Sequence, residues 1–600
     1  MTVVLMSSFT ESLAQYREPV GSAGDSVDFL LNKRKLPSTA IERVPGVAEL
    51  EVMISGSLDA PGSARSGRQQ DQGQELARSL QSANFLVPKA VLARGSGESF
   101  SPSLLSRLKF GRSGASPMDF SPVFSNFPHV KPQLLERDTP EAQAIRRKLL
   151  RGAQVLIFQA GYSGKRFIFE HLKELGVKVS ILDGPDSWAK CLVDEDVIES
   201  YIELDFTDYN TLFERAVDAI LDSGITFDAV ATFYEDAVAV VARLAEALNL
   251  PGNPSAACQA ARNKYVTREI MRQHGLATPK CYRITDVVDL EPAGQHVGFP
   301  AILKPAFGAA SMGVHKVSSQ DELVDTFRAI RATMDVHLDT IWTQGTDLLL
   351  EEFYDGDEFD VDALMSKGEV VYASLSDNWA CWEPWFQETG MNIPSLYPEE
   401  KQAELKAFAS QTLRALGFTD GAFHVEVKYT SRGPRLIEVN ARMGGMCVRD
   451  ANLRTWGVDL VEEHIMTALG IPIRPRMPPE PLVCFAQAAV NAPYSGIVER
   501  SDWLEGLDKY AHCRLKRYLA KAGAKVTGPE DGMPDWVAEI IFEGPDVSEL
   551  LREMREAVQS LPVPIRPFKE DARRGWFFPD FAYPFVRPEV HAVSENSANN

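Results

Sequence analysis

The hydrophobic pattern changes character along the chain. Between residues 55 and 132, Ser, Gly, Gln and Pro are frequent and apolar residues rarely recur at a regular spacing. Such a composition predicts that much of this segment is irregular or disordered. Regular patterning begins at Thr139, where Thr139-Pro140-Glu141 indicates the start of a helix.

After Thr139, buried strands alternate with amphipathic helices. In order, the pattern predicts a strand at 154–159, a turn at 161–164, a helix to 175, strands at 177–182 and 227–233, and a helix at 237–248. Strands that alternate with helices form parallel sheets. Each helix carries the chain back to the end of the sheet at which the previous strand began, so the next strand runs in the same direction. We therefore expect a small doubly wound domain with a parallel sheet at 139–255.

The next segment begins with a helix at 263–274 and is then rich in strands. Strands are predicted at 301–304, 348–353, 361–365, 370–376, 422–428 and 435–439, with helices at 320–333 and 398–416. Hairpin-like pairs with few crossovers favour α+β lobes with mainly antiparallel sheets. The expected fold class is thus multidomain, α/β and then α+β. Its parts are a partly disordered N-terminal region at 1–138, an α/β domain at 139–255, an α+β domain at 256–475, a smaller α+β domain at 476–588 and a polar tail at 589–600.

Length, composition and charge exclude several classes of function. A chain of 600 residues needs several hydrophobic cores. No stretch approaches the roughly 20 apolar residues of a membrane span, and no basic targeting flank opens the chain. The net charge of -21 argues against a nucleic-acid partner. Seven scattered cysteines show no metal or redox spacing, so we expect reduced thiols and a cytoplasmic location.

The strongest chemical clue is a predicted hairpin around Ser431-Arg432-Gly433. If Thr430 pairs with Pro434, Glu426 lies directly opposite Glu438. Two opposed carboxylates repel each other unless a cation lies between them.

Alternation along the two strands adds further polar groups to this face. Asn440 and Arg442 share the face of Glu438, and His424 and Lys428 share the face of Glu426. Carboxylate and amide oxygens suit Mg²⁺, and an arginine can grip a phosphate or a carboxylate. We therefore expect metal and phosphate chemistry here rather than a solvated strand face, with His424 either a base or a structural residue.

Two further motifs carry weaker signals. Lys304 lies on an apolar strand before the small-residue loop 307–314, whose backbone N–H groups could approach phosphate oxygens. The acidic segment 349–361 suits an adenine edge and a ribose hydroxyl pair. Taken alone, each motif is better explained structurally, the first as a lysine before an ordinary turn and the second as an acidic hairpin.

The turn Gly161-Tyr162-Ser163-Gly164-Lys165 lacks both the dinucleotide and the P-loop spacing. We interpret it as a structural or substrate-side turn rather than a cofactor loop. Three tryptophans at 379, 382 and 385 could form an apolar acceptor pocket or pack a lobe.

In their order along the chain, these motifs resemble the ATP-grasp superfamily. Asn263-Lys264-Tyr265, Glu388-Thr389-Gly390 and the segment 438–445 (EVNARMGG) are most similar to the branch that contains carnosine synthase and bacterial L-amino-acid ligases. The resemblance covers about 154–566 and implies an ATP-grasp domain at 256–475, preceded by the parallel-sheet domain. The loop departs from the family pattern at Ala309-Ala310, where glycine or serine is frequent.

The resemblance also implies roles for particular residues. ATP would be bound by Lys264, Lys304, Gly308, Ser311, Met312, Gly313, Glu351, Glu352, Phe353, Tyr354 and Glu358, with Glu351 and the Phe353 backbone at adenine and Glu358 at ribose. Magnesium, or manganese in its place, would be bound by Glu426, Glu438 and Asn440. Arg442 would act with Glu438 and Asn440 in catalysis, and Glu388, Gly444 and Gly445 would face the substrate.

The implied activity is an ATP-dependent carboxylate–amine ligase that forms an acyl phosphate and then a dipeptide or related amide from small-molecule substrates. Alternatives are a catalytically silent ATP-binding scaffold of the same fold and a carboxyl-activating enzyme with another acceptor. Related enzymes are often homodimers, so a homodimer is compatible with the resemblance.

Overall fold

The computed structural model describes residues 130, 132–308, 310–334 and 344–568. The disorder expected before residue 130 and the polar tail at 589–600 lie outside these residues. In the described part of the chain no helix is both long and apolar enough to cross a membrane.

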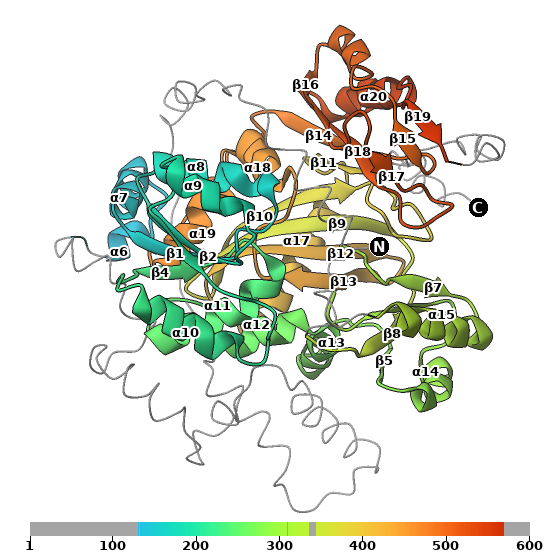
Figure 1. The fold of residues 1–600 in the computed structure, drawn as a ribbon, viewed down its shortest axis with the longest axis horizontal. Coiled ribbons are helices and arrows are strands. Elements are labelled where there is room, and N and C mark those ends of the chain that lie inside the picture. Colours follow the sequence, from blue (N-terminus) through green and yellow to red (C-terminus); the bar gives the residue numbers. More distant parts are fainter. Residues whose placement is uncertain (1–129, 131, 309, 335–343, 569–600) are drawn as a thin grey trace, which may run out of the picture.

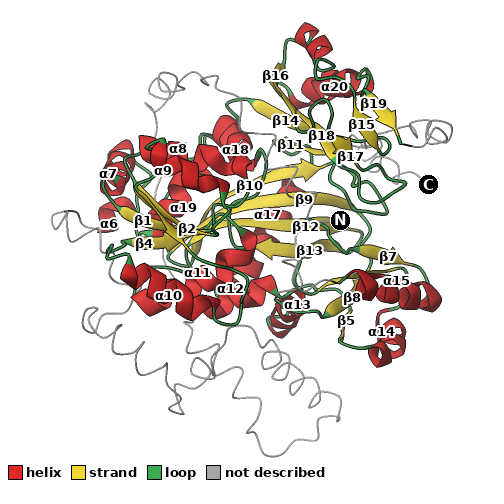
Figure 2. Cartoon of the chain, in the orientation of Figure 1, coloured by secondary structure: helices red, strands yellow, loops and turns green. Residues whose placement is uncertain are grey.

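The N-terminal part of the described chain is the expected parallel sheet, with strand order β3-β2-β1-β4. Its strands are β1 (Gln154–Phe158), β2 (Lys178–Asp183), β3 (Ser200–Glu203) and β4 (Ala229–Ala231), and its helices are α6 (Pro132–Leu135), α7 (Pro140–Leu150), α8 (Arg166–Glu174), α9 (Cys191–Asp194), α10 (Leu212–Asp222) and α11 (Val238–Leu248). Helices cover both faces of the sheet, α8 and α9 on one and α10 and α11 on the other (Figure 2). The sequence pattern missed β3, because this short edge strand is only partly buried and shows no apolar alternation.

A second, four-stranded sheet is antiparallel, with the order β5-β8-β6-β7. It consists of β5 (Cys281–Ile284), β6 (Ala301–Pro305), β7 (His315–Val317) and β8 (Leu348–Glu352), and it packs against α14 (Leu290–Val297) and α15 (Gln320–Thr333). Helices α12 (Ser255–Arg262) and α13 (Lys264–Gln273) connect it to the parallel sheet. Asn263 caps α13, since its side chain accepts hydrogen bonds from the backbone N–H groups of Tyr265 and Val266.

The largest sheet has eight strands in the order β13-β12-β9-β10-β11-β14-β18-β16. Their bounds are β9 (Asp357–Ser366), β10 (Glu369–Asn378), β11 (Gly390–Ile393), β12 (Gly421–Thr430), β13 (Gly433–Asn440), β14 (Cys484–Asn491), β16 (Cys513–Tyr518) and β18 (Trp536–Gly544). All its pairs are antiparallel, as the hairpin pattern predicted. Figure 1 shows the parallel sheet on one side of this sheet and the four-stranded sheet near β13.

The remaining elements pack around the large sheet. They are α17 (Glu399–Ala415), α18 (Val448–Trp456), α19 (Leu460–Ala468), α20 (Val547–Gln559) and a three-stranded sheet of β15 (Gly496–Val498), β17 (Lys525–Val526) and β19 (Ile565–Pro567). Helix α17 buries the odd-numbered apolar side chains of β9 and β12, such as Val361 and Val425. The even-numbered side chains therefore face the opposite side, where the acidic residues lie.

One detail of the predicted hairpin register was wrong. Thr430 pairs with Gly433, not with Pro434, so the register near the turn is shifted by one residue. An irregularity between Glu426 and Val427 absorbs this shift, and Glu426 still lies opposite Glu438. The bulge therefore restores the opposed pair of carboxylates.

Candidate active site

The site is built on the hairpin of β12 and β13. Glu426 and Glu438 are cross-strand partners, and the side-chain amide of Asn440 donates hydrogen bonds to Oε1 of both, at 3.2 Å each. Asn440 is buried and the two glutamates are partly buried. Three oxygen-bearing side chains predicted to share one face thus lie together.

A lysine from helix α13 breaks the symmetry of the glutamate pair. Lys264 Nζ lies 2.6 Å from Glu438 Oε2. Burial disfavours ionisation of both carboxyls, but the Lys264 ammonium outweighs it at Glu438 and lowers that pKa. Burial and the charge of Glu438 raise the pKa of Glu426 well above its usual range. The pair therefore holds one negative charge firmly and resists the second.

This donor set fits magnesium. Mg²⁺ commonly takes one or two carboxylates and completes its shell with water and phosphate oxygens. The described residues contain no group of three or more His, Cys, Asp or Glu that could hold a metal by themselves. Two carboxylates and an amide suit an ion that is shared with a phosphate ligand, and a cation would relieve the repulsion that raises the Glu426 pKa.

Arg442 connects the hairpin to the parallel-sheet domain. One of its Nη atoms donates to Asn440 Oδ1 at 3.3 Å, and its Nε lies 3.0 Å from Glu235 Oε2. Glu235 and its neighbour Asp236 also pair with the buried Arg262, at 3.3 and 2.5 Å. The sequence pattern did not point to Glu235, which follows β4 and carries no motif.

Lys304 lies beside the hairpin on strand β6. Its ammonium pairs with the Glu351 carboxylate, and Arg268 Nε lies 3.2 Å from the same carboxylate. All three residues are buried, and burial lowers the pKa of Lys304. In this structure the Glu351 side chain, expected at adenine, holds Lys304 and Arg268. Arg268 was missed, although its position four residues after Lys264 on one helix face was a usable signal.

The small-residue loop that follows β6 packs next to Lys264, whose Nζ donates to the Gly308 carbonyl at 3.4 Å. Ala310 and Ser311 both have positive φ, 53° and 55°, a conformation that glycine adopts at lower cost. Gly313 has φ 72°, and a Cβ there would lie 3.1 Å from Pro305 Cγ. Met312 is partly buried, and Ala309 lies outside the described residues.

The segment after β8 presents mixed chemistry. The Phe353 ring has Lys316 Nζ 4.1 Å and Lys428 Nζ 6.0 Å from its centroid, and its backbone N–H donates to the Pro300 carbonyl at 3.4 Å. Among the other residues expected at the nucleotide, Glu352 pairs with Arg432 at 2.7 Å, Glu358 lies 4.0 Å from Lys428, and the buried Tyr354 hydroxyl has no hydrogen-bond partner among the described residues. This end of β8 and β9 therefore combines an aromatic face, cations and an acid.

His424 belongs to a buried network that the sequence did not reveal. Its Nδ1 lies 2.8 Å from Asp362 Oδ1, and Asn452 donates to Asp362 Oδ2 at 2.8 Å. Burial opposes protonation, but Asp360 and Asp362 raise the pKa of His424 to about 10. A protonated imidazole cannot accept a proton, so the structure favours a positioning role over a base.

The residues expected at the substrate lie around this network. A Cβ on Gly444 would lie 2.8 Å from His424 Nδ1, whereas one on Gly445 would meet nothing within 4 Å. Glu388 is exposed and close enough to interact electrostatically with His424, Glu438 and Arg442. Of the three tryptophans, Trp379 is buried in the core around β14 and donates to Asn392, so it packs a lobe. Trp382 and Trp385 form an edge-to-face pair with centroids 6.2 Å apart.

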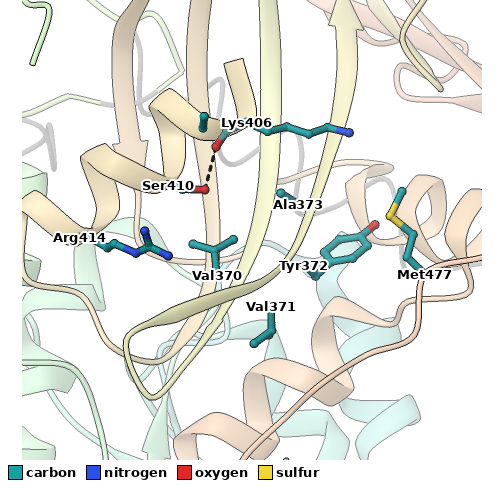
Figure 3. Close-up of a pocket in the computed structure, with 9 residues that line it drawn as sticks. Val370, Val371, Tyr372, Ala373, Lys406, Ser410, Arg414 and Met477 are labelled. Carbon is teal, nitrogen blue, oxygen red and sulfur yellow. Dashed lines mark hydrogen bonds between the residues drawn. The ribbon is translucent and has the colours of Figure 1, made fainter. Parts of the chain in front are cut away.

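A separate cavity of about 360 Å³ lies between β10 and α17 (Figure 3). It is lined by Val370, Val371, Tyr372, Ala373, Lys406, Ala407, Ser410, Arg414 and Met477. None of the acidic or phosphate-binding candidates lines it. We therefore locate the candidate active site at the hairpin and not in this cavity.

Comparison with known proteins agrees with this fold. Residues 297–450 match the family model of the ATP-grasp domain, and residues 169–252 match that of the ATP-grasp N-terminal domain. The chain thus contains an ATP-grasp domain, and a parallel-sheet domain precedes it.

In sequence and structure it is similar to carnosine synthases and to several bacterial ligases. It is 31% identical to human carnosine synthase 1 over 352 residues, which are 56% of this chain and 42% of the relative. It is 27% identical to alanine–anticapsin ligase of Bacillus subtilis, over 42% of this chain and 57% of the relative. The L-amino acid ligase structure from Bacillus licheniformis superposes with a TM-score of 0.61 at 25% identity, covering 69% of this chain and 99% of that one. The chain spans about two fifths of the length of the carnosine synthases that it matches.

Proposed function

We propose that the protein is an ATP-dependent carboxylate–amine ligase. It activates an amino acid or small carboxylic acid as an acyl phosphate and couples it to an amine, giving a dipeptide or related amide, ADP and phosphate. The relatives named above support this class of reaction. The observation that carries the proposal is the pair Glu426 and Glu438, bridged by Asn440 and flanked by Lys264 and Arg442.

The proposed assignment follows from the donor set. Glu426, Glu438 and Asn440 would hold magnesium, which when bound neutralises phosphate charge. Lys264 and Lys304 would bind ATP phosphates, and the loop from Gly308 to Gly313 would cover them and exclude water. The side chains around Phe353 and Glu358 would hold the nucleoside, with Glu351 acting in this structure mainly on Lys304.

The chain's own groups then act on the substrates. Arg442, beside Asn440, would hold the transferred phosphoryl group or the acyl phosphate while the substrate carboxylate attacks the γ-phosphorus. The amine then attacks the activated carbonyl and phosphate leaves. No side-chain nucleophile is required, so catalysis is positioning and electrostatic stabilisation.

Three further expectations belong to the same proposal. The seven cysteines are all free, which supports a reducing, cytoplasmic location. The domain limits at 139–255, 256–475 and 476–588 are also proposed, and a homodimer is compatible with the proposal.

The test is release of phosphate and ADP from MgATP across a matrix of paired amino acids and small amines, with mass spectrometry of the products. Pair-dependent release together with a new amide mass would establish the ligase and name its substrates. Nucleotide binding without turnover in any pair would overturn the proposal in favour of a silent scaffold.

A further inference from the structure

The turn at 159–165 lies where the parallel sheet meets the candidate active site. It follows β1 directly, and in open α/β sheets ligands bind at the carboxyl ends of the strands. Two contacts tie it to the site. Tyr162 Oη lies 4.0 Å from Met446 Sδ, in the loop that follows Arg442, and the Lys165 ammonium donates to the carbonyl of Phe233, two residues before Glu235.

Lys165 makes no salt bridge with any described carboxylate. In the described part of the chain it forms no ion pair, and its Nζ lies 5.6 and 5.8 Å from the ring centroids of Tyr162 and Tyr234. Burial and the nearby Arg442 lower its pKa to about 7, while the Glu235 carboxylate acts in the opposite direction. An ammonium has three donors, and the Phe233 carbonyl takes only one.

The same turn contains buried polar atoms that no described residue satisfies. Gln159 Oε1 and Ser163 Oγ are both buried, and neither has a hydrogen-bond partner among the described residues. Such groups cost free energy unless a ligand or solvent completes them. The backbone of the turn packs closely against the Lys165 side chain. Gly161 has φ 70°, and a Cβ there would lie 3.1 Å from Lys165 Cδ. The Trp188 indole N–H fixes the turn by donating to the Gly161 carbonyl at 2.7 Å.

We propose that Lys165 and Ser163 bind the free carboxylate of an amino-acid acceptor. This inference rests on the proposed ligase function, because such a reaction uses two kinds of carboxylate. The donor carboxylate is consumed at the phosphate, where Arg442 and Asn440 lie. An amino-acid acceptor reacts through its amine and keeps its own carboxylate, which needs a second cation outside the phosphoryl site. Lys165 is close enough to Arg442 for their charges to interact, yet belongs to another domain.

The kinetic test compares matched acceptors with a fixed donor from the substrate matrix. Each L-amino acid acceptor is paired with the corresponding L-amino acid amide, which keeps the amine and lacks the carboxylate. In the wild type we expect a lower KM for the acid. Lys165→Met should raise the KM for the acid about tenfold or more and change the KM for the amide and for ATP less than about twofold.

The control variant is Lys190→Met in the same domain. Lys190 also lies over a tyrosine ring, 5.6 Å from the Tyr201 centroid, but is exposed and paired with Glu203 at 2.6 Å. Lys190→Met should leave the KM values for the acid and the amide acceptors unchanged. Lys165→Arg, which keeps the charge, should recover part of the preference for the acid, and melting curves identify any variant that fails to fold. Equal loss with acid and amide acceptors would overturn the inference.

A binding measurement separates failure of this inference from failure of the ligase proposal. Calorimetry with MgADP present titrates L-alanine and L-alaninamide, and then the other amino acids, into wild type, Lys165→Met and Ser163→Ala. Binding of the acid that is lost in Lys165→Met and weakened in Ser163→Ala supports the site even if no pair turns over. Binding that is the same in Lys165→Met, or absent for every amino acid in the wild type, overturns it.

Discussion

At the scale of single residues, the site depends on how charges are divided within a small cluster. Glu438 pairs with Lys264, whereas Glu426 has no lysine partner among the described residues. The pKa of Glu438 is therefore lowered while that of Glu426 is raised. Asn440 bridges them without adding charge. This division leaves Glu438 as the firm anion and Glu426 as the group that would gain most from a cation.

Glu438→Gln tests this division. The substitution removes the anion that Lys264 faces and one proposed magnesium ligand, while it keeps the side-chain shape. We expect ADP release to fall about 100-fold or more, with the protein still folded by circular dichroism.

The matched control for Glu438→Gln is Glu203→Gln. Glu203 pairs with Lys190 at the same distance, 2.6 Å, but on an exposed surface. That variant should keep full turnover. Undiminished ADP release in Glu438→Gln would remove Glu438 from the site.

Glu463 gives a prediction about pH. It is buried on α19, and burial, together with the neighbouring Glu462, raises its pKa to about 8. Between its unfolded pKa of about 4.3 and pH 8, the unfolded chain has released a proton that the native state keeps. This group therefore makes the free energy of unfolding decrease as pH rises through that window.

Glu463→Gln should remove this pH dependence, because the amide stays neutral. We expect the variant to exceed the wild type in free energy of unfolding at pH 8, on the order of a few kcal/mol, and to approach it near pH 5. Urea denaturation at the two pH values measures the difference. A difference that does not change with pH would contradict the assignment.

At the scale of elements, the turn between β8 and β9 is docked against the end of the hairpin. Gly356 has φ 85°, and a Cβ there would lie 2.1 Å from the Tyr429 carbonyl oxygen on β12. Glu358, two residues later, lies at the proposed nucleoside site. The approach of two backbones thus positions a side chain that the strand pattern alone could not place.

Gly356→Ala should force this turn away from the hairpin. We expect a loss of about 1–3 kcal/mol in the free energy of unfolding beyond that of the control Gly368→Ala, and weaker ADP binding. Gly368 has a similar φ of 79°, but a Cβ added there would meet nothing within 4 Å, so the control carries the backbone strain without the clash. Equal effects of the two variants would show that the turn does not depend on this contact.

At the scale of the whole molecule, the parallel sheet is held to the rest by a buried ionic junction. Asp459, the N-cap of α19, lies 2.9 Å from His171 Nε2 on α8 and accepts from Arg449 on α18. Although burial opposes protonation of His171, Asp459 raises its pKa. One carboxylate therefore joins three helices from two parts of the chain.

Asp459→Asn isolates the charge of this junction, because asparagine still caps a helix well. We expect a loss of about 3–5 kcal/mol in stability, as for other broken buried pairs, and faster hydrogen exchange in α8 and α18. The control is Asp546→Asn at the N-cap of α20, where the described residues provide no ion pair. If both variants lose the same stability, Asp459 stabilises the protein only as a helix N-cap and not through its ion pairs.

The sequence by itself determined the order and type of most elements and the faces of their side chains. Period-two alternation placed Glu426, Glu438 and Asn440 together, and the hairpin confirms that grouping. These features are local: they depend on strand geometry over a few residues, so even a one-residue error at the turn did not disturb them once the bulge was included.

Only the tertiary structure decided which charges meet across elements. Glu351 pairs with Arg268, which lies 83 residues earlier, and Arg442 reaches Glu235 in the preceding domain. Lys165 lies close enough to Arg442 and Glu235 to interact electrostatically with both, from a turn whose sequence fitted no nucleotide motif. No periodicity connects such residues, because their approach is set by how the separate sheets pack and not by their spacing along the chain.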